Sequence, residues 1–285
     1  MSATPRYKLT LAYDGTNFCG WQKQEPTLEQ SQQTGSGKHV DPTLTPGEAG
    51  RVALRTVQGV LERAVREIVR EMVEVRGASR TDSGVHARGQ VAAFSCTGLE
   101  AGPVGWPVSR GTDGLVRAIN GKLPPDVVVL KADVVSEMFD PIGDCTSKAY
   151  SYSIHNAKTR ELFERDYVHH VWDALDVDAM QRAAADLVGE HDFAGFAAAG
   201  HGRQTTVRTI RRLDVTKVRE NRVRIDVEGN GFLWNMVRII AGTLVDVGRG
   251  IKKAEEMPAI LESRDRSKAG PTLPPTGLFL EWIRY

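Results

Sequence analysis

Short runs in which apolar and polar residues alternate, or in which apolar residues follow one another, predict the strands of this chain. The first run covers residues 7–13 and ends at the turn signal Asp14-Gly15. Further strands are expected at residues 72–75, 91–94, 127–130, 150–154, 207–218, 222–227 and 277–285. These runs are spread along the whole chain, so we expect strands in both of its halves.

Apolar residues that recur every three or four positions predict helices between the strands. The clearest stripe runs through residues 57–69, and Thr56 precedes it as the expected N-cap. Other helices are expected at 115–120, at 177–188 with Gly189 as its C-terminal stop, and at 232–247. Residues 25–50 and 98–114 show no period, and we interpret the first of them as a mobile loop or an insertion.

The order of these elements predicts a mixed α/β (α+β) fold. Strand–helix–strand units occur in both halves, which indicates two similar halves around a shared cleft. We place the first half at residues 1–138, with the 25–50 insertion, and the half that completes the cleft at residues 139–285. No repeat is visible residue by residue, so the similarity rests on the order of elements.

The composition is that of an ordinary globular protein, with 285 residues, 41% of them hydrophobic and 26% charged. A net charge of +1 means that any nucleic-acid surface must be a local patch. Cys19, Cys96 and Cys145 stand far apart, which favours a reducing compartment over a disulfide framework. The sequence shows neither a signal peptide nor the roughly 20 apolar residues of a membrane span, so we expect a cytoplasmic protein.

Residues 77–90 are the most informative stretch, because polar residues and three glycines lie between two expected strands. Arg80 and Asp82 stand two apart there, flanked by small residues that allow another molecule to come close. The neighbouring cation should keep the Asp82 carboxyl ionised at neutral pH. A turn-capping role for Asp82 is an equal alternative from the residue alone, although a plain turn seldom combines Arg80, Asp82 and His86.

Metal and nucleotide-cofactor sites are not predicted. The seven histidines are scattered, and no metal-binding cluster of His and Cys occurs, so we expect His86 to be a hydrogen-bonding loop residue. The Gly-Asn-Gly sequence at residues 229–231 lacks the third glycine of a dinucleotide fingerprint. We therefore expect neither a metal nor a cofactor.

Three further features have a structural and a functional interpretation. Tyr150 and Tyr152 share a strand face, and one of them could stack on a nucleobase while the other is an ordinary half-buried tyrosine. Arg238 lies in an apolar helix, where it either reaches water or pairs with a buried carboxylate such as that of Asp82. The third feature is a cluster of basic residues, which is either a solvated sheet face or a phosphate-binding patch. Its members are Arg203, Arg208, Arg211, Arg212, Lys217, Arg219, Arg222 and Arg224.

An ordered set of motifs along almost the whole chain resembles the tRNA pseudouridine synthase A family. The Arg-Thr-Asp-x-Gly-Val-His core lies at residues 80–86, and a Tyr-x-Tyr strand at 150–152. The remaining matches are Tyr-Asp-Gly-Thr-x-Phe-x-Gly-Trp-Gln at 13–22, Thr-Val-Gln-Gly-x-Leu-Glu at 56–62, Leu-Pro-x-Asp at 123–126, Gly-x-His-Asp-Phe at 189–193, Asn-x-Phe-x-x-x-Met-Val-Arg at 230–238 and the ending at 270–280.

The resemblance implies an enzyme of the pseudouridine synthase fold that isomerises uridine to pseudouridine in the anticodon arm of tRNA, at the family-typical positions 38–40. Asp82 matches the catalytic aspartate that attacks the uridine, and Arg80 matches the residue that helps to extrude the target base. Tyr150 matches the tyrosine that stacks on the flipped uracil, and Arg238 the basic partner of the aspartate. A homodimer without a cofactor is implied, and Arg208, Arg211 and Arg212 are our RNA-binding candidates.

The chain departs from the family pattern at three places. Ser79 replaces the usual glycine before Arg80. The family's Phe-His-Ala-Arg-Phe-Ser-Ala segment reads Phe-Asp-Pro-Ile-Gly-Asp-Cys at residues 139–145, which bears on substrate choice if relatives contact RNA there. The 25–50 segment is absent from compact members and either shapes tRNA access or is a tolerated surface insertion.

Two other classes of function compete with a synthase. An RNA-binding protein or tRNA chaperone of the same fold, without catalysis, would not require Asp82, Tyr150 and Arg238 together. A glycoside hydrolase would need a second carboxylate near Asp82, and no motif supplies one.

Overall fold

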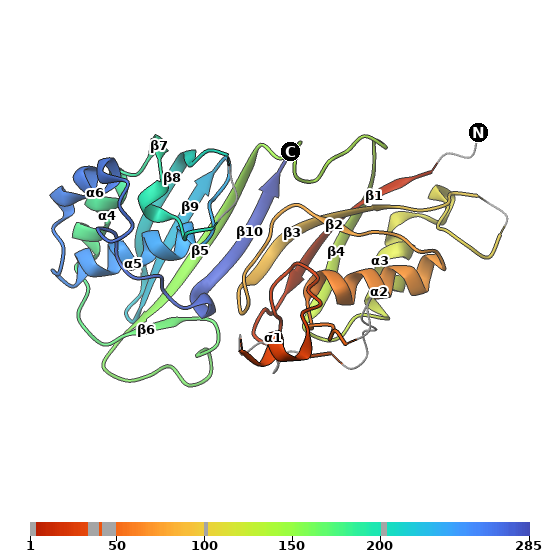
Figure 1. The fold of residues 1–285 in the computed structure, drawn as a ribbon, viewed down its shortest axis with the longest axis horizontal. Helices are drawn as coiled ribbons and strands as arrows, with labels where there is room; N and C mark the ends of the chain where they lie inside the picture. Colours follow the sequence, from red (N-terminus) through yellow and green to blue (C-terminus); the bar gives the residue numbers. More distant parts are fainter. Residues whose placement is uncertain (1–3, 34–39, 42–49, 100–101, 201–203) are drawn as a thin grey trace. The chain divides into compact units, whose positions relative to one another are not determined.

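A computed structural model describes residues 4–33, 40–41, 50–99, 102–200 and 204–285 (Figure 1). The chain divides into two compact units, Met1–Cys145 and Thr146–Tyr285. Within the described residues, no helix has both the length and the apolar composition needed to cross a membrane.

The first unit contains a four-stranded antiparallel sheet with two long helices. Its elements are β1 (Arg6–Tyr13), α1 (Leu28–Gln33), α2 (Val57–Val69), β2 (Arg76–Gly77), β3 (His86–Ser95), η2 (Val108–Arg110), α3 (Thr112–Asn120) and β4 (Val127–Val135). β1 lies between β3 and β4, and β2 pairs with β3, so the strand order is β4-β1-β3-β2. Every second residue of β1 is buried, as the alternation in the sequence predicts.

The second unit repeats this plan with additional short elements. It contains β5 (Ser147–Asn156), β6 (His169–Val171), α4 (Val177–Ala185), β7 (Gly189–Asp192), η3 (Ala194–Phe196), β8 (Val207–Arg219), β9 (Arg222–Gly229), α5 (Met236–Gly248), η4 (Ala254–Glu256), α6 (Met257–Ser263), η5 (Pro275–Gly277) and β10 (Leu278–Arg284). β5 pairs with β9 and β10, β9 with β8, and β8 with β7, all of them antiparallel. β6 runs parallel to the end of β5.

Both units have the same β-α-β-β-α-β order, which explains the similarity that the sequence indicates. In each, the first strand is central, the third strand pairs on one side and the last strand on the other. The second strand, β2 or β8, pairs with the third. This is the ferredoxin-like arrangement, and β7 is an extra edge strand of the second unit. The predicted mixed α/β fold is confirmed, and its strands pair in a mostly antiparallel way.

Helix α2 follows the sequence prediction closely. It spans Val57–Val69, and the Thr56 hydroxyl accepts a hydrogen bond from the Gly59 amide at 3.3 Å, as expected of an N-cap. The amides of Val57 and Gln58 donate to the carbonyls of Gly20 and Trp21, so the first turn is also held by the loop after β1.

Several predicted bounds are wrong, because tertiary contacts override the local pattern. Residues 72–75 form no strand; Val73 and Val75 are buried, and their backbone groups bond to side chains of α2. The helix predicted at 177–188 ends at Ala185, and Gly189, at φ +122°, opens β7. The helix predicted from 232 begins at Met236, after Asn235 adopts a left-handed conformation.

The segment predicted as a loop at residues 25–50 contains ordered structure where it is described. α1 forms there, and the Val52 and Leu54 amides donate to the carbonyls of Pro26 and Gln24. Thr27 pairs with Arg51 and Val40 with Leu54 in isolated bridges. Residues 34–39 and 42–49 of this segment lie outside the described residues.

Candidate active site

The loop between β2 and β3 is anchored through Thr81, the residue between Arg80 and Asp82. The Thr81 side chain is buried, with its hydroxyl 2.8 Å from the Tyr13 hydroxyl, and its carbonyl accepts from the Trp21 amide at 3.0 Å. Arg80 is exposed and Asp82 is half-buried. Thr81 is therefore firmly held, and the Arg80 cation and the Asp82 carboxylate lie on either side of it in the chain.

A tight turn follows Asp82 directly. The Val85 amide donates to the Asp82 carbonyl at 3.1 Å, and Gly84 has φ +78°, the conformation required at the third position of a type II turn. The Phe18 carbonyl accepts from the Gly84 amide and from the Ser83 hydroxyl. A side chain at Gly84 would be strained, which explains the glycine of the motif.

Gln90 also holds the loop, through hydrogen bonds between its side chain and the backbone of Ser79. The side chain is fully buried on β3. Its amide donates to the Ser79 carbonyl at 2.7 Å and to the Tyr13 hydroxyl at 3.4 Å, and its oxygen accepts from the Ser79 amide at 3.2 Å. Both backbone groups of Ser79 are thus satisfied by one side chain. In the sequence, the one indication of this role is that a polar side chain, Gln90, stands directly before the apolar run 91–94.

The motif after β1 packs so closely against this loop that only glycine fits at several positions, of which Gly20 and Gly77 are examples. Gly20 has φ +83°, and a Cβ there would lie 2.6 Å from the Thr81 carbonyl oxygen. A Cβ on Gly77 would lie 2.3 Å from the buried indole of Trp21. The loop position is therefore set by direct contact between two separate motifs.

His86 is a buried hydrogen-bonding residue of the loop, as predicted. The Gly15 amide donates to its Nδ1 at 3.1 Å, which leaves the ring proton on Nε2. Asp14 Oδ1 lies 3.2 Å from the same Nδ1. With that nitrogen already accepting, we interpret this contact as a close approach and not as an ion pair. The Asp14 carboxylate accepts instead from the Thr16 amide and hydroxyl.

In the second unit, the two tyrosines of β5 have different environments. Tyr152 is fully buried, and its hydroxyl donates to the Pro274 carbonyl at 2.7 Å. Burial raises the pKa of Tyr152, against the opposing effect of the Arg238 charge. Tyr150 is also buried, and its ring meets the edge of Phe232 at 5.2 Å between centroids and 83° between planes. The hydroxyl of Tyr152 is therefore held by a hydrogen bond, and the ring of Tyr150 by an aromatic contact.

Arg238 lies in the first turn of α5 and is held at both ends of its guanidinium. Nε donates to the Leu273 carbonyl at 2.6 Å, and one terminal nitrogen donates to Asn235 Oδ1 at 2.8 Å. Asn235 adopts φ +61°, which asparagine tolerates better than most residues. The half-buried side chain therefore has a defined position, which argues against the interpretation that it merely reaches water.

Comparison with known proteins identifies the family. A tRNA pseudouridine synthase A 2 of Clostridium perfringens is 38% identical over 278 residues, 98% of each chain. The tRNA pseudouridine synthase A of Acetivibrio thermocellus is 39% identical over 98% of each chain. The chain belongs to the tRNA pseudouridine synthase family.

Two further observations agree with this assignment. The family model described as tRNA pseudouridine synthase matches residues 183–285. The tRNA pseudouridine synthase A of Myxococcus xanthus is 40% identical over 99% of this chain and 92% of its own. The protein is therefore a pseudouridine synthase, an isomerase. Both alignments cover 98% of each chain, so these two relatives have nearly the same length as this synthase.

Much of the basic cluster of this synthase is neutralised by carboxylates. Arg212 pairs with Asp214, and Arg224 lies 2.7 Å from Asp226 and 3.4 Å from Glu281. Arg219 and Arg222 share Glu164. Arg212 and Arg219 are exposed and fit the interpretation of a solvated sheet face, whereas the Arg222 side chain is only 11% exposed. Arg211 is exposed, Arg208 donates to the Thr205 carbonyl, and Arg203 lies outside the described residues.

The altered segment at residues 139–145 forms its own turn in the synthase. Asp140 Oδ1 accepts from the Ile142 amide at 2.9 Å, and Asp144 Oδ2 accepts from the Asp140 amide at 2.9 Å. The Ile142 hydrogen bond is the main reason that the pKa of Asp140 is lowered, and Arg76 adds a weaker effect. The two acidic residues therefore cap the turn in which they lie.

Proposed function

We propose that this synthase isomerises uridine to pseudouridine in the anticodon arm of tRNA, with the Asp82 carboxylate as nucleophile. The observation that carries the proposal is the anchored loop, which presents a half-exposed carboxylate beside an exposed guanidinium. The turn after Asp82 is closed by its backbone carbonyl, which accepts a hydrogen bond from the Val85 amide.

The reaction balances without a further reactant. The carboxylate bonds to the sugar carbon C1′ while the bond between C1′ and N1 breaks, and its electron pair stays on the base. The base then rotates, and C5 bonds to C1′ while the bond between C1′ and the carboxylate breaks, which returns the free carboxylate. The hydrogen of C5 leaves to solvent as a proton, and N1 gains a proton. No electrons pass to an acceptor, which is consistent with the expected absence of a cofactor.

The other site residues have separate roles in the proposal. A base in a stem must leave its stack before C1′ can be reached, which costs a few kcal/mol. Arg80, exposed next to Asp82, would take the place of the extruded base. Tyr150, held by Phe232, would stack on the uracil, and the Arg238 charge would stabilise the Asp82 carboxylate.

We also propose that the enzyme is a cytoplasmic homodimer that binds tRNA phosphates through exposed arginines, with Arg211 and Arg208 as the first candidates and Arg212 as a weaker one. Light scattering of the purified protein tests the dimer directly. A monomer at the concentrations used for activity would overturn that part of the proposal and leave the reaction untouched.

The decisive experiment measures tritium release from anticodon stem-loops whose uridines carry tritium at C5. We expect release by wild type and a loss of at least about 1,000-fold in Asp82→Ala, because the nucleophile is gone. Asp113→Asn, at the exposed start of α3, is the matched control and should behave as wild type. Replacing the uridines one at a time by cytidine identifies the modified position.

Each competing function predicts a different outcome. Binding of the stem-loop without tritium release by wild type would favour the silent RNA-binding protein. Appearance of free uracil would favour glycosidic hydrolysis. Full activity of Asp82→Ala would leave the family assignment intact and remove Asp82 from the mechanism.

A further inference from the structure

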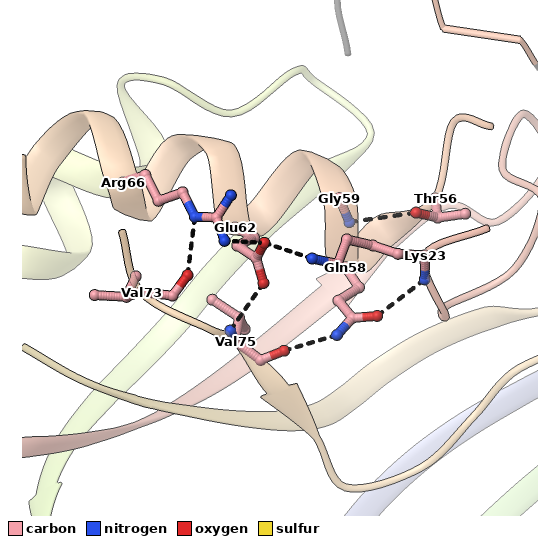
Figure 2. A network of polar contacts seen from close by, with 8 residues as sticks. All are labelled: Lys23, Thr56, Gln58, Gly59, Glu62, Arg66, Val73 and Val75. Atoms are coloured by element: carbon pink, nitrogen blue, oxygen red, sulfur yellow. Dashed lines mark hydrogen bonds and ion pairs between the residues drawn. The ribbon is translucent and has the colours of Figure 1, made fainter. Parts of the chain in front are cut away.

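The chain leading into the active-site loop is held by side chains of α2 where a strand partner would normally be expected (Figure 2). Arg66 Nε donates to the Val73 carbonyl at 2.9 Å. Glu62 Oε2 accepts from the Val75 amide at 3.0 Å, and Gln58 Nε2 donates to the Val75 carbonyl at 2.9 Å. Both backbone groups of Val75 are therefore satisfied by one helix face.

The same helix face also holds the segment after β1. Gln58 Oε1 accepts from the Lys23 amide at 2.9 Å, and Lys23 Nζ lies 2.6 Å from Glu62 Oε1. Trp21, two residues before Lys23, donates its amide to the Thr81 carbonyl and accepts at its carbonyl from the Gln58 amide. Figure 2 shows Gln58 and Glu62 reaching from α2 to both segments. The active-site loop is thus connected to α2 through Val75 at its start and through Trp21 at its centre.

Glu62 is the central charge of this network and is only 2% exposed. Its carboxylate meets Lys23 Nζ, an Arg66 terminal nitrogen at 2.7 Å and the Val75 amide. A buried carboxylate requires such partners, because removal of one partner of a buried pair is strongly destabilising. Lys23 and Arg66 are about one-third exposed, so water can solvate them if Glu62 is replaced. The Val75 amide is held in the buried part of the network.

We propose that Glu62 is a positioning residue for catalysis, which fixes the active-site loop by binding the Val75 amide; this rests on the proposed function of Asp82. Gly77, where the loop begins, is two residues beyond Val75, and Asp82 is seven beyond it. Side chains of α2 take the place of a strand ladder at Val73 and Val75, so the segment just before the loop depends on these few hydrogen bonds. Misplacement of a reacting group by about 1 Å can cost about 100-fold in rate.

Kinetics of Glu62→Ala and Glu62→Gln on the tritiated stem-loop test the proposal. We expect Glu62→Ala to lower kcat by at least about tenfold while KM changes less than about threefold, because the loop shifts but the RNA surface remains. Glu62→Gln should recover much of this loss, since its amide oxygen can still accept from Val75. Glu67→Gln is the matched control: Glu67 is a half-exposed residue of α2 that pairs with Lys122.

A loss of folding is separated from a loss of positioning in two ways. All variants are assayed well below their unfolding temperatures, with circular dichroism and RNA affinity measured in the same buffer. Hydrogen exchange should accelerate at residues 73–86 in Glu62→Ala and at none of the strands β8 to β10. Wild-type kcat in a folded Glu62→Ala would overturn the positioning role, and absence of tritium release by wild type would overturn the proposed function instead.

Discussion

Asp192, at the end of β7, shows how one carboxylate makes stability depend on pH. The Thr206 hydroxyl donates to it, which is the main reason that its pKa is lowered; the Ala194 amide and the Arg264 guanidinium act in the same direction. A pKa that is lower in the folded state contributes stability above the unfolded value of about 3.9. That contribution disappears as the pH falls through the folded pKa.

We therefore expect Asp192→Asn to lower the free energy of unfolding by about 1 kcal/mol at pH 7, the value of a typical hydrogen bond. The difference from wild type should shrink as the pH drops below about 4. Urea unfolding of both proteins across this pH range measures it. Asp186→Asn, exposed after α4, is the control. A difference that grows in acid would contradict the assignment.

Single residues of the candidate active site differ in how far the sequence predicts them. Asp82, Arg80 and Tyr150 lie in recognisable local patterns, and the structure places each in a firmly held element. Gln90 and Glu62 lie in a strand and a helix whose patterns concern burial, so their partners, 11 and 13 residues away in sequence, could not be foreseen. A side chain that bonds to distant backbone leaves no periodic signal.

Helix α2 binds the segment before the candidate active-site loop and begins at a buried N-cap. Thr56→Ala removes the acceptor of the Gly59 amide, and both residues are buried, so water cannot replace it. We expect a loss of about 1–2 kcal/mol in the free energy of unfolding, the upper part of the range for such caps.

The comparison is Asp176→Ala, which removes the cap of α4. Asp176 is exposed and accepts from the Ala179 amide at 2.8 Å. Water can satisfy that amide, so the loss should be smaller, about 0.5–1 kcal/mol. Chemical denaturation of both variants measures the two values. Equal losses would show that burial of the cap does not matter here.

The sequence predicts elements with a strong internal pattern well. It does not predict segments whose backbone hydrogen bonds are made by other parts of the fold. β1, α2, β8 and β9 have clear alternation or stripes and appear close to the expected bounds. Residues 72–75 alternate like a strand, yet α2 supplies their hydrogen-bond partners. The pattern reports which side chains are buried, but not which group pairs with the backbone.

At the scale of the whole molecule, a net charge of +1 leaves RNA binding to local patches, and many arginines already have carboxylate partners. We expect Arg211→Ala to weaken tRNA binding and to reduce the slope of log affinity against log salt by about 0.7–0.9, the value for one phosphate contact.

Arg212→Ala is the matched control for that prediction, because Arg212 is the next residue of β8 and pairs with Asp214. Its slope should change less, since the Asp214 carboxylate competes with a phosphate for the guanidinium. Filter binding at several salt concentrations gives both slopes. A larger effect of Arg212→Ala would show that its ion pair opens when RNA binds.

The sequence by itself determined the order of the main strands and helices, the family and the residues that carry the proposed chemistry, because these depend on local periodicity and on motifs contiguous in the chain. Only the tertiary structure decided that both units share one strand order, that the Tyr152 hydroxyl donates to the Pro274 carbonyl, and that Gln58 and Glu62 of α2 hold the chain leading to Asp82. Those features depend on hydrogen bonds between segments distant in sequence, and such bonds form only when hydrophobic burial has brought the segments together.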